Sequence, residues 1–236
     1  MPSSTATSTG LTLKGSVKTV AEFFKYSVNN ILYQREIYPT ESFKAEKVYG
    51  LSMFVTRDEG LAGYLDNVLQ QIEGWLTTGN LQKLVLVITS QATGETLERW
   101  VFDLQTDKSI GPEERVDKDE KEIKAEIAAI QRQITASVTF LPLNDEPCAF
   151  DLLVYTDDDI QVRFDSVPRP AVPAPLVLRL SPALRVHATR ARLPQVPKAW
   201  EESDPRLIVN SDEVKLRSFT TKVHKVDASV TYRADD

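Results

Sequence analysis

Three segments of the chain carry apolar residues at the spacing of one buried helix face. Apolar positions recur every three or four residues from Val17 to Leu32, and the same pattern returns over residues 61–76 and 123–138. Because a helix has about 3.6 residues per turn, positions at this spacing lie on one side of it. The pattern predicts helices over residues 16–35, 61–76 and 117–138, each packed against another apolar surface.

Shorter apolar runs predict strands. Runs rich in β-branched and aromatic residues, a composition typical of strands, occupy residues 48–56, 84–89, 97–104, 150–155, 208–209, 214–223 and 226–232. Gly94 lies between two of these runs, where a hairpin turn would use its freedom to adopt positive φ. Three helices and strands from both halves of the chain predict an α+β fold, with the helices packed on one largely antiparallel sheet.

One segment breaks this pattern. Residues 162–195 hold 6 of the 13 prolines of the chain but no lysine and no glycine. Proline removes a backbone donor and favours extended polyproline conformations. We therefore expect an irregular, mobile excursion over residues 162–195, and a disordered N-terminus over the small and polar residues 1–10.

Composition narrows the class of protein. A net charge of -6 and a pI near 5.2 argue against a nucleic-acid partner, since phosphate binding needs a concentrated basic face. No apolar run approaches the roughly 20 residues of a bilayer-spanning helix, so we expect no membrane contact. Cys148 is the single cysteine, which leaves no intramolecular disulfide and indicates a reducing compartment.

Candidate chemistry is sparse. The chain has two histidines, His187 and His224, so a small hydrolase using His224 is one hypothesis, although a strand histidine is more often a packed residue. The acidic run at 157–159 lacks the ligand spacing of a calcium loop, and no glycine-rich nucleotide motif occurs, so we predict no metal and no cofactor. Arg132 and Gln133 lie on the polar face of the third predicted helix, where arginine is either solvated or part of an interface. The pattern favours a protein that is not an enzyme.

Several motifs resemble the spindle assembly checkpoint branch of the HORMA family, in the same order along the chain. They are LTLKGS at 11–16, VAEFF at 20–24, ILYQR at 31–35, IYP at 37–39, LERW at 97–100, RQITA at 132–136, TFLPL at 139–143, WEES at 200–203 and LRSFTT at 216–221. The resemblance covers residues 11–161 and 196–232. It implies the HORMA fold and a non-enzymatic adaptor.

The resemblance also implies two folded topologies, open and closed, that differ in where the terminal strands pair. In the closed form a C-terminal safety belt crosses a linear motif of a partner and holds it as an added strand. The implied receiving strand is Phe150, Asp151, Leu152, Leu153, Val154 and Tyr155, and the implied belt positions are Val196, Pro197, Trp200, Leu216, Arg217, Phe219, Thr220, Thr221 and His224. The implied partners are a coiled-coil kinetochore scaffold protein, the co-activator of the anaphase-promoting complex and other checkpoint-complex subunits.

Self-association and a switch position follow from the same resemblance. A closed copy would recruit an open copy through Arg132, Gln133 and Phe140, while Leu13 would lie in an N-terminal strand that leaves its place when the belt moves. The implied role is to delay anaphase onset, in the nucleus, at the kinetochore and in the cytoplasm. Another HORMA adaptor, serving translesion polymerase or the meiotic chromosome axis, is the alternative.

Residues 162–195 interrupt the family pattern. The resemblance then gives a HORMA core at 11–161 and a safety belt at 196–236, with the extra residues at the root of the belt. Three interpretations remain open: a tolerated disordered loop, translated intron sequence, and a tethered pseudo-ligand. The third rests on the extended apolar stretch at 175–180, which a belt could trap at high effective concentration.

Overall fold

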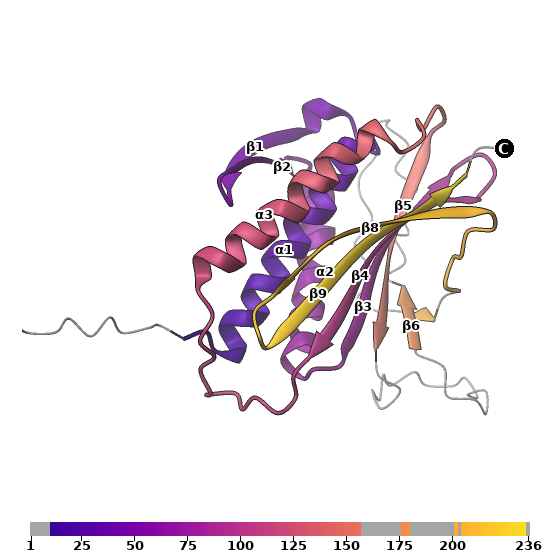
Figure 1. The fold of residues 1–236 in the computed structure, drawn as a ribbon. Coiled ribbons are helices and arrows are strands. Elements are labelled where there is room, and N and C mark those ends of the chain that lie inside the picture. Colours follow the sequence, from indigo (N-terminus) through magenta and orange to yellow (C-terminus); the bar gives the residue numbers. More distant parts are fainter. Residues whose placement is uncertain (1–9, 157–175, 180–200, 203, 235–236) are drawn as a thin grey trace, which may run out of the picture.

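Helices cover one face of an antiparallel sheet (Figure 1). The computed structural model describes residues 10–156, 176–179, 201–202 and 204–234. Within these ranges the α-helices are α1 (Leu13–Gln34), α2 (Glu59–Thr77) and α3 (Glu120–Ala136), and two 3-10 turns occupy Thr40–Ser42 and Ser137–Thr139. The arrangement confirms the predicted α+β fold, with helices and a sheet built from both halves of the chain.

Each helix begins where a side chain caps its free backbone amides. Asp58 accepts from the Leu61 amide at 2.7 Å at the start of α2, and Asp119 accepts from the Lys121 amide at 2.9 Å at the start of α3. Because Asp119 caps α3, that helix begins later than the sequence pattern predicted. Helix α2 ends just before Gly79, whose φ of +67° is a conformation that favours glycine.

The main sheet has seven strands in the order β7-β6-β5-β3-β4-β9-β8, and all neighbours are antiparallel. The strands are β3 (Leu81–Ser90), β4 (Thr96–Thr106), β5 (Cys148–Thr156), β6 (Leu176–Arg179), β7 (Glu201–Glu202), β8 (Ser211–Thr220) and β9 (His224–Arg233). Strands β3 and β4 form the predicted hairpin, in which Gly94 has a φ of +74°. The C-terminal hairpin β8–β9 pairs with β4 through β9 and forms one edge of the sheet, while β6 and β7 form the other edge.

Two predictions of strands were wrong. Residues 48–56 do not form one strand, because Tyr49 (φ +54°) and Gly50 (φ +72°) make a turn between β1 (Phe43–Val48) and β2 (Leu51–Thr56), a separate hairpin. Residues 208–209 were predicted as a strand, but they lie in the connection before β8, where Val209 is 84% exposed. An alternation of two residues carries too little periodicity to separate a strand from a loop.

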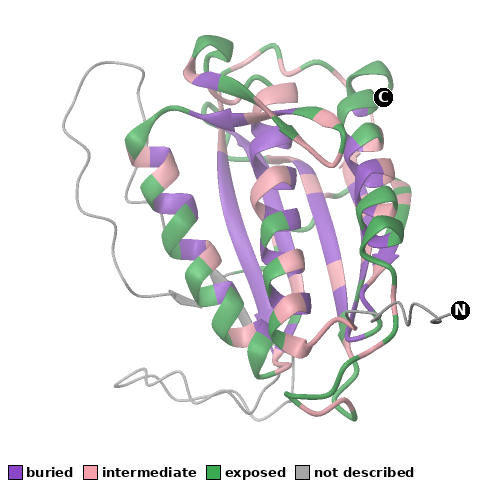
Figure 2. Cartoon of the chain, turned by 90° about the vertical axis from the view of Figure 1, so that its left-hand side faces the viewer, coloured by how far each residue is buried: buried purple, intermediate pink, exposed green. Residues whose placement is uncertain are grey.

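The core lies between the helices and the sheet, where the buried sides of the helices face the buried strands (Figure 2). Phe23 of α1 contacts Phe102 of β4 and Phe219 of β8, with ring centroids 5.5 and 4.8 Å apart. Burial of a phenylalanine side chain contributes about 1.5–3 kcal/mol. Phe219 therefore anchors the C-terminal hairpin on the first helix.

A buried ion pair ties the end of α1 to β4. The Arg35 Nε donates to Glu98 Oε1 at 2.8 Å, and the indole nitrogen of Trp100 donates to Glu98 Oε2 at 2.9 Å. Both charged side chains are almost fully buried, at 4% and 3% exposure. An unpaired charge at such a buried position costs folding free energy, so Arg35 and Glu98 must be present together. This contact gives a physical role to the LERW motif.

Candidate functional site

Strand β5 contains the receiving residues that the resemblance implied, and its side chains are buried on both faces of the sheet. Phe150, Leu152 and Val154 belong to the core beneath the helices. Leu153 and Tyr155 belong to a second apolar cluster on the other face, together with residues of β3 and β4. Since these side chains are covered, an incoming strand meets the backbone N–H and C=O groups of β5.

In this structure a strand of the same chain occupies that edge of β5. Strand β6 pairs with β5 so that Val154 lies opposite Leu178 and Tyr155 lies opposite Val177. Strand β7 then pairs with the outer edge of β6, with Glu202 opposite Leu178 (Figure 1). The expectation of an irregular excursion over residues 162–195 was therefore wrong at 176–179. The physical reason is that no proline lies between Pro175 and Pro182, so every backbone donor of this stretch is present.

Other predicted belt positions fall in three places. Val196, Pro197 and Trp200 lie outside the described residues. Leu216, Arg217, Phe219 and Thr220 lie in β8, and Thr221 and His224 lie in and after the turn that leads to β9. The predicted belt thus contributes to both edges of the sheet, with β7 beside β6 and the β8–β9 hairpin beside β4.

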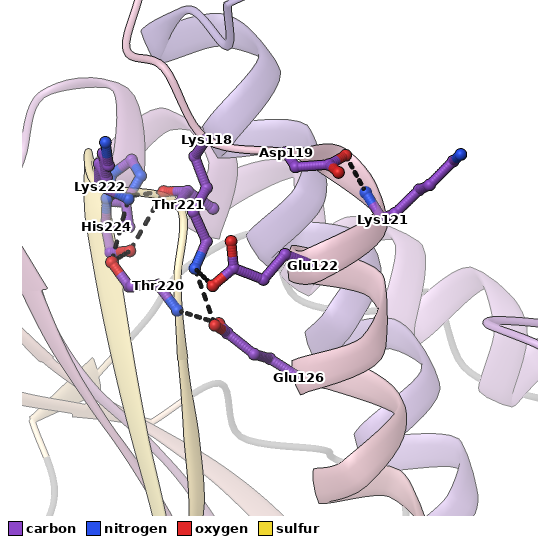
Figure 3. A network of polar contacts seen from close by, with 9 residues as sticks. All are labelled: Lys118, Asp119, Lys121, Glu122, Glu126, Thr220, Thr221, Lys222 and His224. Atoms are coloured by element: carbon purple, nitrogen blue, oxygen red, sulfur yellow. Dashed lines mark hydrogen bonds and ion pairs between the residues drawn. The ribbon is translucent and has the colours of Figure 1, made fainter.

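Helix α3 holds the outer edge of β8 through polar side chains. The pairing of β8 with β9 shifts register between Lys215 and Ser218, and there the Arg217 amide donates to Gln133 Oε1 at 2.7 Å. The Thr220 amide donates to Glu126 Oε2 at 3.0 Å (Figure 3). Without these two acceptors, the backbone N–H groups at the edge of β8 would hydrogen-bond to solvent or to another chain. The resemblance had placed Gln133 at a self-association surface, but here its oxygen contacts the belt.

Lys118 completes this contact. Its Nζ lies 2.8 Å from both Glu122 Oε1 and Glu126 Oε1, so it neutralises the carboxylate that accepts from Thr220 (Figure 3). Burial lowers the pKa of Lys118, but the hydrogen bonds to the two glutamates outweigh this effect and the pKa is raised. Neither Lys118 nor Glu126 was predicted, because nothing in the local sequence pattern indicates that Glu126 contacts a strand 94 residues away or that Lys118 pairs with it.

His224 is a packed residue at the first position of β9. Its Nε2 lies 3.3 Å from the Leu76 carbonyl at the end of α2, and its Nδ1 lies 2.6 Å from the Ser16 hydroxyl in α1. Since a carbonyl only accepts, the neutral ring donates from Nε2 and accepts the Ser16 proton at Nδ1. Ser16 also lies 2.6 Å from the Thr221 hydroxyl. Burial lowers the pKa of His224, only partly opposed by the hydrogen bond to Leu76, so the neutral ring is favoured.

This environment argues against the hydrolase hypothesis. A serine and a histidine within hydrogen-bond distance are the beginning of a nucleophilic pair, but Ser16 and His224 are both 0% exposed. A substrate would have no access to either side chain. The contact instead joins α1, α2 and the C-terminal hairpin, which makes His224 a structural residue.

The remaining predicted positions lie at the two ends of the helical layer. Arg132 is exposed on α3, and Phe140 beyond its end is 41% exposed. Leu13 is the first residue of α1 and packs partly against the core, so it does not lie in a strand in this structure, and its predicted role as a switch position stays a prediction. The physical reason is the cap: Thr12 accepts from the Gly15 amide at 3.2 Å and starts the helix there. Among the described residues near this end, which begin at Gly10, Leu11 alone keeps strand-like pairing, through a bridge to Val116.

The described part of the chain contains no helix that is both long and apolar enough to cross a membrane. Among the same residues, no group of three or more histidine, cysteine or acidic side chains is arranged to hold a metal ion.

Comparison with known proteins identifies the class of protein that this fold and this sheet edge define. The HORMA domain family matches residues 16–169, and the chain therefore belongs to the HORMA family. The match ends inside the segment predicted as an insertion, so the boundaries of the core, the insertion and the belt stay predictions.

Relatives narrow the class further. The mitotic spindle assembly checkpoint protein MAD2A of Dictyostelium discoideum is 49% identical over 99% of this chain and 98% of its own length. The human protein of the same name is 44% identical over 95% of this chain and 93% of its own length. A chain in a crystal structure of the mitotic checkpoint complex matches with a TM-score of 0.71 at 39% identity, covering 93% of this chain and 99% of that chain. Within the HORMA family, this chain is a spindle assembly checkpoint protein of the MAD2 type, a non-enzymatic adaptor.

Proposed function

We propose that this protein is a switchable clamp that holds linear motifs of its partners at the β5 edge, and that the structure represents its closed topology. The observation that carries the proposal is the arrangement at the two edges of the sheet. A short strand is added to β5 and β7 pairs with its outer side, while the β8–β9 hairpin lies beside β4. An open topology would place the C-terminal strands differently.

The physical basis of such a clamp is β-augmentation. The backbone groups of β5 supply affinity, and the side chains of the incoming strand supply selectivity because alternate residues face opposite sides of the sheet. A strand that is paired on both sides, with β5 and with β7, must lose both sets of hydrogen bonds before it leaves. The belt therefore acts mainly on the dissociation rate.

The partners in this proposal are linear motifs of a coiled-coil kinetochore scaffold protein and of the co-activator of the anaphase-promoting complex. The motifs shared with checkpoint HORMA proteins support this assignment, as does the similarity to a chain of the mitotic checkpoint complex. Holding the co-activator would delay anaphase onset until chromosomes attach. The protein would then act in the nucleus, at the kinetochore and in the cytoplasm, together with other checkpoint-complex subunits.

A closed copy also recruits an open copy in this proposal, through the C-terminal end of α3. Arg132 is exposed there, and three apolar side chains that follow it are exposed as well: Val138 at 42%, Phe140 at 41% and Leu143 at 79%. Exposed apolar residues beside an arginine are typical of an interface. Gln133 would contribute by holding Arg217 of β8, so that the surface depends on the position of the belt.

Capture from mitotic cells tests both parts of the proposal. Tagged wild-type protein and an Arg132→Ala variant are used as bait, and the partners and a second, differently tagged copy are measured in the eluate. Both baits should retain the co-activator and the scaffold protein, while the variant should recruit on the order of tenfold less of the second copy.

Lys124→Ala is the matched control, since Lys124 lies on the same helix, is 55% exposed and pairs only with the neighbouring Glu120 in the contacts described. It should behave as wild type. Equal recruitment by the wild type and Arg132→Ala would contradict the role of Arg132. Absence of both partners from every bait would contradict the clamp itself.

A further inference from the structure

We propose that residues 176–179 are a tethered internal ligand, which occupies the partner edge of the clamp and competes with external motifs. The inference rests on the proposed function and adds to it a regulatory contact within the chain. Its basis is that β6 lies between β5 and β7, the position that a trapped partner strand would take.

The sequence of this stretch suits an added strand. Leu176, Val177 and Leu178 are an aliphatic run followed by Arg179, in a segment whose other residues include six prolines. Aliphatic and β-branched residues favour extended pairing, while Pro175 and Pro182 limit how far a ladder can extend to either side. The two prolines therefore limit strand pairing to the short stretch between them, and β6 lies in this stretch.

Competition follows from the hydrogen-bonding capacity of β5. Its inner edge pairs with β3 along the whole strand, so only the outer edge is open to an added strand. Residues 153–156 of that edge pair with β6. A backbone group that is already bonded to β6 is not available to a second strand, so the internal strand and a partner motif exclude each other over these residues.

Tethering strengthens the internal competitor. A strand linked to its own site has an effective concentration that reaches the millimolar range for a short flexible linker. The apparent dissociation constant of an external motif rises by the inverse of the fraction of molecules with a free edge, so an edge that is free in about a tenth of molecules weakens binding about tenfold. The external ligands that compete are extended peptides with aliphatic positions like those of β6.

The inference also accounts for a closed arrangement without a partner. Strand β7 needs a neighbouring strand to bond to, and β6 provides it through Leu178 and Arg179. The chain then satisfies the edge groups of β5 by itself. A partner with a better-fitting motif would replace β6 rather than enter an empty site.

Proline substitution tests the internal ligand in the full chain. The double variant Val177→Pro, Leu178→Pro lacks two consecutive backbone N–H groups of β6. Because consecutive N–H groups of a strand point to opposite edges, hydrogen bonds to both β5 and β7 are lost. The matched control is Val186→Pro with His187→Pro, two changes of the same kind in the same segment but outside β6. Hydrogen exchange of the β5 amides and binding of a labelled synthetic peptide of residues 174–182 are measured for all three proteins.

The β6 variant should exchange those amides of residues 153–156 that face β6 at least about tenfold faster, and it should bind the added peptide at least about tenfold more tightly than wild type. The control should match wild type in both assays. Equal exchange and equal peptide affinity in all three proteins would overturn the internal ligand and leave partner capture from mitotic cells unaffected. Failure of partner capture, with the differences in exchange intact, would contradict the proposed function instead.

Discussion

At the scale of single residues, His224 links the C-terminal hairpin to two helices. Its ring contacts Ser16 of α1 and the Leu76 carbonyl of α2. Its own backbone amide donates to the Thr221 hydroxyl at 2.8 Å (Figure 3). The two ring contacts join the start of β9, which pairs with β4, to the helical layer. The protonation state of the buried His224 side chain therefore affects the folding stability of this topology.

The pH dependence of unfolding should report this residue. Burial lowers the pKa of His224 in the folded protein below its ordinary value of 6.5. The unfolded chain then takes up a proton as the pH falls through about 6.5 while the folded chain does not, so folded stability is lost in that direction. Between pH 7.5 and 5.5, wild type should lose more free energy of unfolding than His224→Gln, by up to about 1.4 kcal/mol, as measured by urea denaturation at each pH.

His224→Gln is a suitable comparison because its amide keeps one donor and one acceptor but does not titrate. All other titrating groups are common to both proteins, and their contributions cancel in the difference. If both proteins lose the same free energy over this pH range, the neutral buried state assigned to His224 is wrong.

At the scale of elements, the contact between α3 and β8 decides whether the outer edge of the sheet is protected. Glu126→Ala removes the acceptor of the Thr220 amide, and a lost hydrogen bond of this kind is worth about 0.5–1.5 kcal/mol. The Thr220 amide should therefore exchange up to about tenfold faster in this variant, as measured by hydrogen exchange with NMR detection.

Glu126→Gln separates the hydrogen bond from the charge. Its amide oxygen can still accept from Thr220, while the ion pair with Lys118 is lost. Exchange at Thr220 should remain close to the wild-type rate. Equal acceleration by the alanine and glutamine variants would mean that the charge on Glu126, rather than its acceptor oxygen, holds β8.

The elements were predictable from the sequence to different degrees. The helices were found because long segments with a strict 3.6-residue period leave little ambiguity. Strand β1 was missed because only Phe43 among its residues is buried, so it lacks an apolar alternation. Strand β6 was expected only under the pseudo-ligand interpretation, because its four residues are held by the edge of β5, a tertiary partner, within a proline-rich segment. The apolar run at 150–155 predicted β5 and the resemblance gave its role, but the residues that contact β8 and His224 became visible only in three dimensions.

At the scale of the whole molecule, one C-terminal segment contributes to both edges of the sheet. Strand β7 closes the side of β5 and β6, and the β8–β9 hairpin closes the side of β4 (Figure 1). Between them, the connection that includes the exposed Leu207 and Val209 has few buried contacts to break. In the proposed clamp, this division would let the belt hold a ligand at one edge while it is anchored at the other.

If β7 retains a strand bound to β5, loss of β7 must raise the dissociation rate of that strand. A labelled peptide of the co-activator motif is bound to the variant carrying Val177→Pro and Leu178→Pro, whose edge is free of β6, and its release is followed after dilution. Adding Glu201→Pro with Glu202→Pro removes backbone donors of β7, whereas Glu201→Ala with Glu202→Ala keeps them. Release should be at least about tenfold faster with the prolines and unchanged with the alanines. Equal release rates from all three proteins would contradict the clamp.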